Sequence, residues 1–176
     1  YGVVALAITL TIVYMMQIYN KHNQKLYEIS VKDSLTGLYN RRYFSDYVQK
    51  EYDRFIRLHQ IFSIVLLDIN HFKKVNDQYG HQTGDQVLKD VARIIIENIR
   101  NYDICARYGG DEFILVLPNT NEKEAIKQVD RMMMELKEYF KKYGDIYLDV
   151  AFGVTDSQGK TITEIIQFAD QRLYID

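Results

Sequence analysis

The chain has 176 residues, which is enough for one globular domain with a short appendage. Its formal net charge of −2 argues against broad binding to nucleic acid or another polyanion. The single cysteine, Cys105, excludes an intrachain disulfide and indicates a small core residue in a reducing compartment. The first residue is Tyr1 rather than Met, which indicates a piece of a longer protein.

Residues 1–19 contain no charge and one glutamine, and as a helix they roughly span a ~30 Å hydrocarbon core. A buried core helix is the alternative, but the segment is apolar all round, which favours a transmembrane helix or the end of one. A basic start and a small-residue cleavage site are absent, which argues against a signal peptide. Lys21, His22 and Lys25 follow at once, so we expect a cell-membrane protein with the downstream domain in the cytoplasm.

Residues 20–32 are polar with a few apolar positions, and we interpret them as a linker or helical stalk before a domain at 33–176. A turn-like segment at 33–42 precedes a helix that ends near His59. The apolar run 61–68 predicts a strand buried on both faces that ends in the carboxylate of Asp68. A basic and polar segment at 69–77 leads to a turn at Gly80.

Apolar residues at helical spacing predict amphipathic helices over 83–100 and 121–142. A strand is expected at 146–152 and a final helix at 161–174, where Thr161 and Glu164 have capping-box spacing. Between that strand and helix, 153–161 looks like a phosphate-binding loop, but five residues instead of four separate its glycines, so we interpret it as an ordinary connection.

Two short strands, 103–108 and 113–117, flank a tip that contains Gly109, Gly110, Asp111 and Glu112. We expect a β-hairpin whose glycines adopt positive φ. Adjacent carboxylates repel each other unless a cation lies between them, so the tip suits a metal-bound polyphosphate. The alternative is an acidic turn in solvent. The order of elements predicts an α+β fold with helices over a sheet that contains an antiparallel hairpin.

Five separated motifs occur in order: D-S-L-T-G-L-Y-N-R-R at 33–42, D-I-N-H-F-K-K-V-N-D at 68–77, G-H-Q-T-G-D at 80–85, R-Y-G-G-D-E-F at 107–113 and A-D-Q-R-L-Y at 169–174. Together they resemble the GGDEF family of diguanylate cyclases. The resemblance implies a central five-stranded, mainly antiparallel sheet flanked by helices, similar to the palm of polymerases and nucleotidyl cyclases. It also implies the condensation of two GTP into cyclic di-GMP and two pyrophosphates at the interface of a homodimer, with no nucleic-acid partner.

The resemblance implies a site for Mg²⁺ or Mn²⁺, because hard cations prefer carboxylate and phosphate oxygens. The implied metal residues are Asp68, Ile69, Asp111 and Glu112. The last two are also the implied catalytic residues, and Asp111 is the candidate that helps to deprotonate the attacking hydroxyl. Substrate binding is implied for Gly109 and Gly110, which let the nucleotide approach the backbone, for Asn76 and Asp85 at guanine, and for Phe72 and Lys73 at phosphate. For Lys73, a surface salt bridge is an equal alternative.

Arg100 and Asp103 form an R-x-x-D motif, and five residues separate Asp103 from Gly109. This is the spacing of the family's product-inhibition site, where a guanidinium and a carboxylate suit cyclic di-GMP. Arg131 on the next helix completes the expected site. The alternative for R-x-x-D alone is an ion pair at a helix end.

This sequence departs from the family in two places. Asn70 stands where the family often has a second Asp, but the first acid, Asp68, is present, so we expect the site to survive. The last motif stops before a lysine that helps to hold phosphates in the family, so we expect a truncated C-terminus from which one phosphate contact is missing. Two further hypotheses compete with the cyclase: a silent GGDEF module that binds GTP, cyclic di-GMP or a protein partner, and a nucleotidyl cyclase or polymerase-like enzyme with another substrate.

Overall fold

A computed structural model describes residues 2–143 and 149–173, and the chain divides into two compact units, 1–32 and 33–176. The first unit is one uninterrupted helix, α1 (Gly2–Val31), so the stalk expected at 20–32 is helical almost throughout. Within the described part of the chain, no helix is both long and apolar enough to cross a membrane. The transmembrane helix and the membrane location therefore stay predictions from the sequence pattern.

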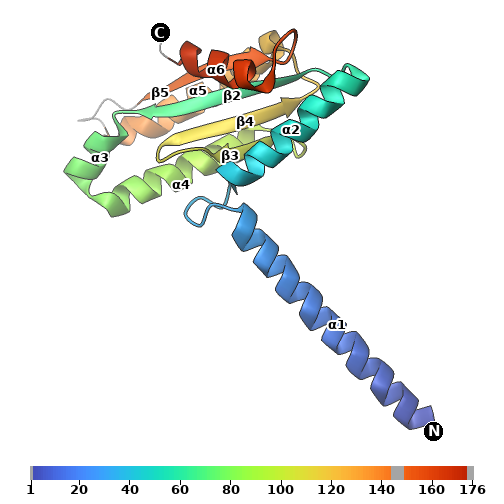
Figure 1. Ribbon diagram of the computed structural model, residues 1–176. Helices are drawn as coiled ribbons and strands as arrows, with labels where there is room; N and C mark the ends of the chain where they lie inside the picture. Colours follow the sequence, from blue (N-terminus) through green and yellow to red (C-terminus); the bar gives the residue numbers. More distant parts are fainter. Residues whose placement is uncertain (1, 144–148, 174–176) are drawn as a thin grey trace. The chain divides into compact units, whose positions relative to one another are not determined.

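The second unit is a five-stranded sheet with helices on both faces (Figure 1). Its strands are β1 (Tyr39–Asn40), β2 (Phe62–Asn70), β3 (Ile104–Arg107), β4 (Glu112–Pro118) and β5 (Asp149–Asp156), in the spatial order β1-β3-β4-β2-β5. Only the β1–β3 pair is parallel among these strands; β3–β4, β4–β2 and β2–β5 are antiparallel. The expected α+β fold with a mainly antiparallel five-stranded sheet is confirmed.

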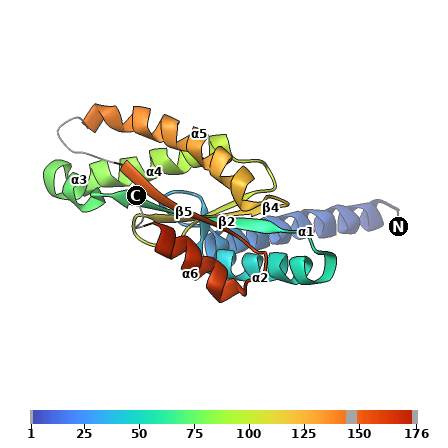
Figure 2. The ribbon, with the colours of Figure 1, turned by 90° about the horizontal axis from the view of Figure 1, so that it is seen from above.

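Two hydrophobic cores lie on opposite faces of the sheet, because side chains alternate between the faces of a strand. Helices α4 (His81–Asn98) and α5 (Glu122–Phe140) cover one face, and α2 (Arg41–Leu58) and α6 (Ile162–Arg172) cover the other (Figure 2). Along β2, Leu67 and Ile69 pack with the first pair of helices, whereas Ile64 and Leu66 pack with the second. Burial on both faces explains why this strand is apolar at nearly every position.

Capping explains several helix ends. Thr161 and Glu164 form the predicted capping box at the start of α6, and Asn121 and Glu124 form another at the start of α5. The predicted last helix is therefore correct within the described residues, although Tyr174 lies outside them. The strand expected at 146–152 instead runs from Asp149 to Asp156 in its described part, and residues 146–148 lie outside it.

The segment 69–77 was not expected to be helical, yet α3 (Phe72–Tyr79) lies there and α4 begins directly after it. Phe72, Val75 and Tyr79 share one side of α3 at helical spacing, but the helix has only eight residues and no side-chain cap at its start, so neither its length nor a capping pattern indicates it in the sequence. Contacts with α4 supply the packing that its own composition does not predict. This pair of helices places two of the expected guanine-binding residues, as described below.

Candidate functional site

Two of the expected metal-binding acids face each other across neighbouring strands. Asp68 on β2 is the register partner of Glu112, the first residue of β4. Each lies two residues from a side chain of the core under α2 and α6, Leu66 and Ile114 respectively, so both carboxylates project from that same face. Directly opposed like charges destabilise a sheet, so this pair has a cost in the free protein.

The pKa of Asp68 reflects this unfavourable electrostatic environment. Burial raises the pKa of its carboxyl group to about 6 from an ordinary 3.8, and the negative charges of Asp111 and Glu112 add to the increase. The three acids that sequence analysis assigned to one site therefore interact electrostatically. A cation at this position would remove the repulsion that the free protein sustains.

Main-chain hydrogen bonds hold the tip of the β3–β4 hairpin in place. The amides of Tyr108 and Gly109 both donate to the carbonyl oxygen of Glu112, at 2.8 and 3.3 Å. The Ile69 amide donates to the carbonyl of Asp111 at 3.3 Å, which joins the tip to the end of β2. The hairpin prediction is correct, but the expected positive φ is wrong: neither Gly109 nor Gly110 has one.

The acids do not form a complete metal cage. Among residues 2–143 and 149–173, no three His, Cys, Asp or Glu side chains form a group that could hold a metal ion by themselves. Mg²⁺ is nonetheless a fit, because it usually binds through one or two carboxylates and takes its other ligands from substrate phosphates and water. The Ile69 side chain is buried in the core and has no ligand atom, so any metal role for Ile69 is limited to its backbone oxygen.

The expected guanine-binding residues lie on the α3–α4 pair. Asn76 of α3 rests directly over Gly84 of α4: a Cβ at position 84 would lie 1.9 Å from Asn76 Oδ1 and 3.2 Å from the Phe72 ring. Asp85 is the next residue along α4 and is exposed. The close approach of the two helices therefore depends on a glycine, and it brings Asn76 and Asp85 to adjoining positions. Lys73, at the start of α3, is exposed.

The expected inhibitory residues are also brought together, where the C-terminal end of α4 and the loop after it meet the first half of α5. Asp103 is buried, and its Oδ2 accepts from the Arg100 amide at 2.8 Å and from Gln128 Nε2 at 3.2 Å. Its Oδ1 is buried with no hydrogen-bond partner among the described residues. Arg131 Nε donates to Asn98 Oδ1 at 3.3 Å, and Gln128 Nε2 also donates to the Asn98 carbonyl at 3.4 Å. Sequence reasoning missed Asn98 and Gln128, which connect the three expected residues.

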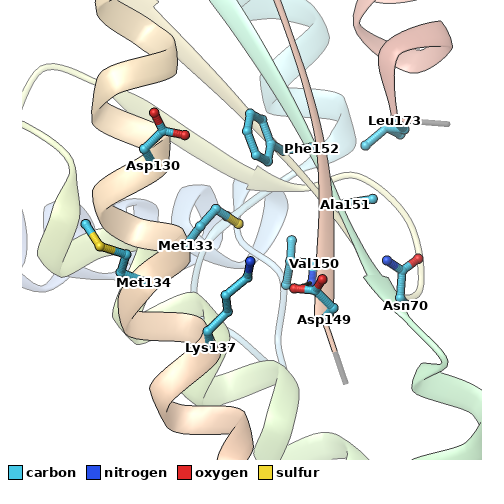
Figure 3. Close-up of a pocket in the computed structure, with 10 residues that line it drawn as sticks. All are labelled: Asn70, Asp130, Met133, Met134, Lys137, Asp149, Val150, Ala151, Phe152 and Leu173. Carbon is cyan, nitrogen blue, oxygen red and sulfur yellow. Dashed lines mark hydrogen bonds between the residues drawn. The ribbon is translucent and has the colours of Figure 1, made fainter. Parts of the chain in front are cut away.

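The fold also contains open pockets. One of about 610 Å³ lies between α5 and β5 and is lined by side chains that include Met133, Lys137 and Phe152 (Figure 3). Asn70, the departure from the family pattern, also lines it, but the acid pair does not. Another pocket, of about 520 Å³, adjoins the acid site, because Glu112 lines it together with Tyr108 and residues of α6.

A further residue pair supports the hairpin. Arg107 donates from Nε and Nη2 to the carbonyl of Gly110, at 3.2 and 2.7 Å, and its Nη1 lies 3.3 Å from the carboxylate of Asp33. Sequence reasoning included both residues in motifs but assigned them no role. The signal was their presence at the edges of two motifs 74 positions apart, and spacing alone does not show that they touch.

The fold and the site together define an α+β domain that presents clustered carboxylates beside a glycine-containing hairpin. The profile of the family "Diguanylate cyclase, GGDEF domain" matches residues 30–175, and the chain belongs to the GGDEF family.

Known proteins resemble the chain in sequence and in fold. It is 35% identical over 147 residues to diguanylate cyclase DosC of Escherichia coli K12, a match that covers 81% of this chain and 32% of DosC. The coiled-coil and GGDEF domain structure of DgcB from Caulobacter crescentus, in complex with c-di-GMP, matches with a TM-score of 0.83 and 24% identity over 96% of this chain and 91% of that one. A second structure, of the DgcB GGDEF domain with c-di-GMP, matches with a TM-score of 0.75 and 29% identity over 82% of this chain and 88% of that one. The chain thus spans about a third of the length of DosC.

Proposed function

We propose that this chain condenses two GTP molecules into cyclic di-GMP and two pyrophosphates, with one GTP held by each of two copies of the domain. The observation that carries the proposal is the opposition of Asp68 and Glu112 across β2 and β4, with Asp111 close enough to raise the pKa of Asp68. A fold has no structural need for three mutually repelling acids at one edge. Membership of the GGDEF family and the 35% identity to diguanylate cyclase DosC support the same activity.

The reaction joins the 3′-oxygen of one GTP to the α-phosphorus of the other. The bond between the α-phosphorus and the bridging oxygen to the β-phosphate breaks, and pyrophosphate leaves with that oxygen. The proton of the hydroxyl group passes toward Asp111, which lies on the hairpin tip and acts as the base. A second, symmetric step closes the ring. Because each copy holds one GTP, a single copy lacks the partner nucleotide and is inactive.

Asp68 and Glu112 hold the divalent cation in this proposal, with Asp111 adjacent. Bound Mg²⁺ lowers the charge on the triphosphate and the pKa of the attacking hydroxyl. The protein's own contribution is positional, since β2 and β4 fix the two carboxylates on one face of the sheet. The backbone amides at the start of α3, near Phe72 and Lys73, are available to phosphate oxygens.

Guanine selectivity rests on the α3–α4 pair. The N1–H and N2–H₂ groups of guanine are donors, and an exposed carboxylate such as Asp85 accepts from both. The Asn76 amide both donates and accepts, so it can pair with another edge of the base. Adenine presents a different pattern of hydrogen-bond donors and acceptors at these atoms, so ATP is expected to be a poor substrate.

The proposal includes feedback inhibition by cyclic di-GMP at Arg100, Asp103 and Arg131. The hydrogen bond from the Arg100 amide to Asp103 Oδ2 supports it, because it keeps the two residues of the R-x-x-D motif together. Arg100 is exposed and available to a phosphate. The c-di-GMP complex of the DgcB GGDEF domain, 29% identical to this chain, supports binding of the same ligand.

One incubation tests the activity. The dimerised domain is supplied with GTP and Mg²⁺, and the products are separated by chromatography, with Asp111→Asn as the matched inactive variant. The proposal is supported if the unchanged protein forms cyclic di-GMP and Asp111→Asn does not. GTP binding without any cyclic dinucleotide would instead indicate a binding module, and a cyclic product from ATP would indicate another nucleotidyl cyclase.

A further inference from the structure

The first glycine of the hairpin tip lies against the carboxylate of Glu112. A Cβ built on Gly109 would lie 2.2 Å from Glu112 Oε2, 3.0 Å from its Cδ and 3.3 Å from its Cβ. Real carbon atoms do not approach an oxygen to 2.2 Å, so any side chain at 109 would displace the carboxylate. The backbone itself does not require a glycine here, because the φ of Gly109 is not positive.

Main-chain hydrogen bonds prevent the backbone from moving to relieve that contact. The Gly109 and Tyr108 amides are both bonded to the Glu112 carbonyl oxygen, at 3.3 and 2.8 Å. On its other side, Glu112 is in register with Asp68 of β2. Residues 109 and 112 are therefore held together by the main chain, and the flexible part of the pair is the Glu112 side chain.

Gly110 provides an internal comparison. It also lacks a positive φ, but a Cβ at this position would meet no atom within 4 Å. Two adjacent glycines without positive φ thus differ in what a side chain would meet: the first faces the carboxylate and the second faces open space.

We propose that Gly109 is a positioning residue for Glu112, and that its missing side chain provides the space in which the carboxylate lies. The consequence for metal binding rests on the proposed function. The steric relationship between the two residues does not depend on it.

A double-mutant cycle in thermal stability tests the steric relationship without metal or nucleotide. Alanine in place of a glycine with ordinary φ restricts the unfolded chain and raises Tm, here by about 1–4 °C for Gly110→Ala. Gly109→Ala is expected to give no such increase, or a decrease, because Glu112 must move. In the Glu112→Ala background the 2.2 Å contact is absent and only the 3.3 Å contact with the Cβ of residue 112 remains, so Gly109→Ala is expected to change Tm more favourably there than with Glu112 present. An equal increase from Gly109→Ala with Glu112 present would overturn the proposal.

Binding of Mn²⁺ alone, followed by water-proton relaxation, tests the consequence. Gly109→Ala is expected to weaken Mn²⁺ binding about as much as Glu112→Gln does, and the double variant is expected to be no weaker than Glu112→Gln. Gln82→Ala, an exposed change on α4, is the control and is expected to bind Mn²⁺ within about two-fold of the unchanged domain. Additive losses in the double variant would contradict positioning through Glu112. If the unchanged domain binds no Mn²⁺, the metal role fails, and the stability cycle still decides whether Gly109 positions Glu112.

Discussion

Arg107 connects Asp33 to the tip of the β3–β4 hairpin: its Nη1 lies 3.3 Å from the Asp33 carboxylate, while Nε and Nη2 donate to the Gly110 carbonyl. Both side chains are largely buried, at 17% and 21% exposed, so this ion pair is screened less than a surface pair. Asp33 also accepts from the amide and hydroxyl of Thr36, at 2.9 and 2.7 Å. The turn at the start of the domain thus fixes the guanidinium that fixes the tip.

We expect Asp33→Ala to lower the stability of the domain by about 1–2 kcal/mol, because it leaves Arg107 without its charge partner. Cyclase turnover is expected to fall about ten-fold, since the tip loses part of its support. Denaturant unfolding and product chromatography measure the two effects. Arg93→Ala is the matched control: its pair with Glu97 is about half exposed on both sides and its second contact, with Asp90, is long at 3.7 Å, so their loss should cost less than about 0.5 kcal/mol.

The same pair predicts an acid dependence. Burial alone would raise the pKa of Asp33, but the hydrogen bonds from Thr36 and the charge of Arg107 outweigh it and lower that pKa below the ordinary 3.8. A lowered carboxyl pKa contributes stability that is present above the unfolded-state value and is lost as pH falls through the folded-state value. The stability gap between the unchanged domain and Asp33→Ala should therefore persist at pH 5 and narrow below about pH 4. A gap that stays constant down to pH 2 would show that the ion pair contributes little.

Asp68→Asn is expected to abolish turnover and to stabilise the fold. Its folded-state pKa of about 6 lies above the ordinary 3.8, so the charged form is disfavoured in the folded protein and stability falls as pH rises through this window. Removing the charge should raise stability at pH 7 by about 1 kcal/mol after allowance for solvent screening, or about 2–4 °C in Tm. The increase should shrink as pH falls from 6 to 4, because the unchanged Asp68 then becomes neutral as well. Calorimetric unfolding at pH 4 and pH 7 measures it, and a constant increase at both would contradict the cause.

Gly84→Ala is expected to weaken GTP binding by about ten-fold, because the new Cβ would meet Asn76 Oδ1 at 1.9 Å and displace it. Helix α4 itself should tolerate the change, since alanine favours a helix by about 1 kcal/mol over glycine. Calorimetric titration with GTP measures the affinity. Gln82→Ala, on the same helix and exposed, serves as the control and should bind GTP as the unchanged domain does. If Gly84→Ala bound GTP as tightly as the unchanged domain, Asn76 would not be part of the guanine site.

Arg100→Ala is expected to weaken cyclic di-GMP binding by at least about ten-fold, because a charge-assisted contact to the ligand is lost. Asp103→Asn should weaken it as well, since the negative charge that attracts the guanine N–H donors is lost. Its effect on stability should be followed in parallel, because Asp103 Oδ2 accepts from the Arg100 amide. Arg93→Ala, which carries the same charge change on α4, is the control. Unchanged calorimetric binding after Arg100→Ala would refute the inhibitory site.

The sequence by itself determined the elements whose residues repeat with a clear period and the family to which the chain belongs. Helices α4 and α5 were predicted from their apolar stripes, β2 from a continuous apolar run and the start of α6 from its capping box, because local side-chain patterns dictate these elements. The β3–β4 hairpin was predicted from two glycines and two acids between two short apolar strands. Helix α3 was missed because it has only eight residues and no side-chain cap at its start.

Only the tertiary structure decided how these pieces meet. Strand register places Asp68 opposite Glu112, and a shift of one residue would have sent one of them to the other face of the sheet. No local pattern encodes the contact between Arg107 and Asp33 across 74 positions, or the fit of Asn76 over Gly84. Positive φ was expected at Gly109, whereas in the structure its φ is not positive and the Glu112 carboxylate lies where a Cβ would be, because a sequence shows that a side chain is missing but not which neighbour fills the space.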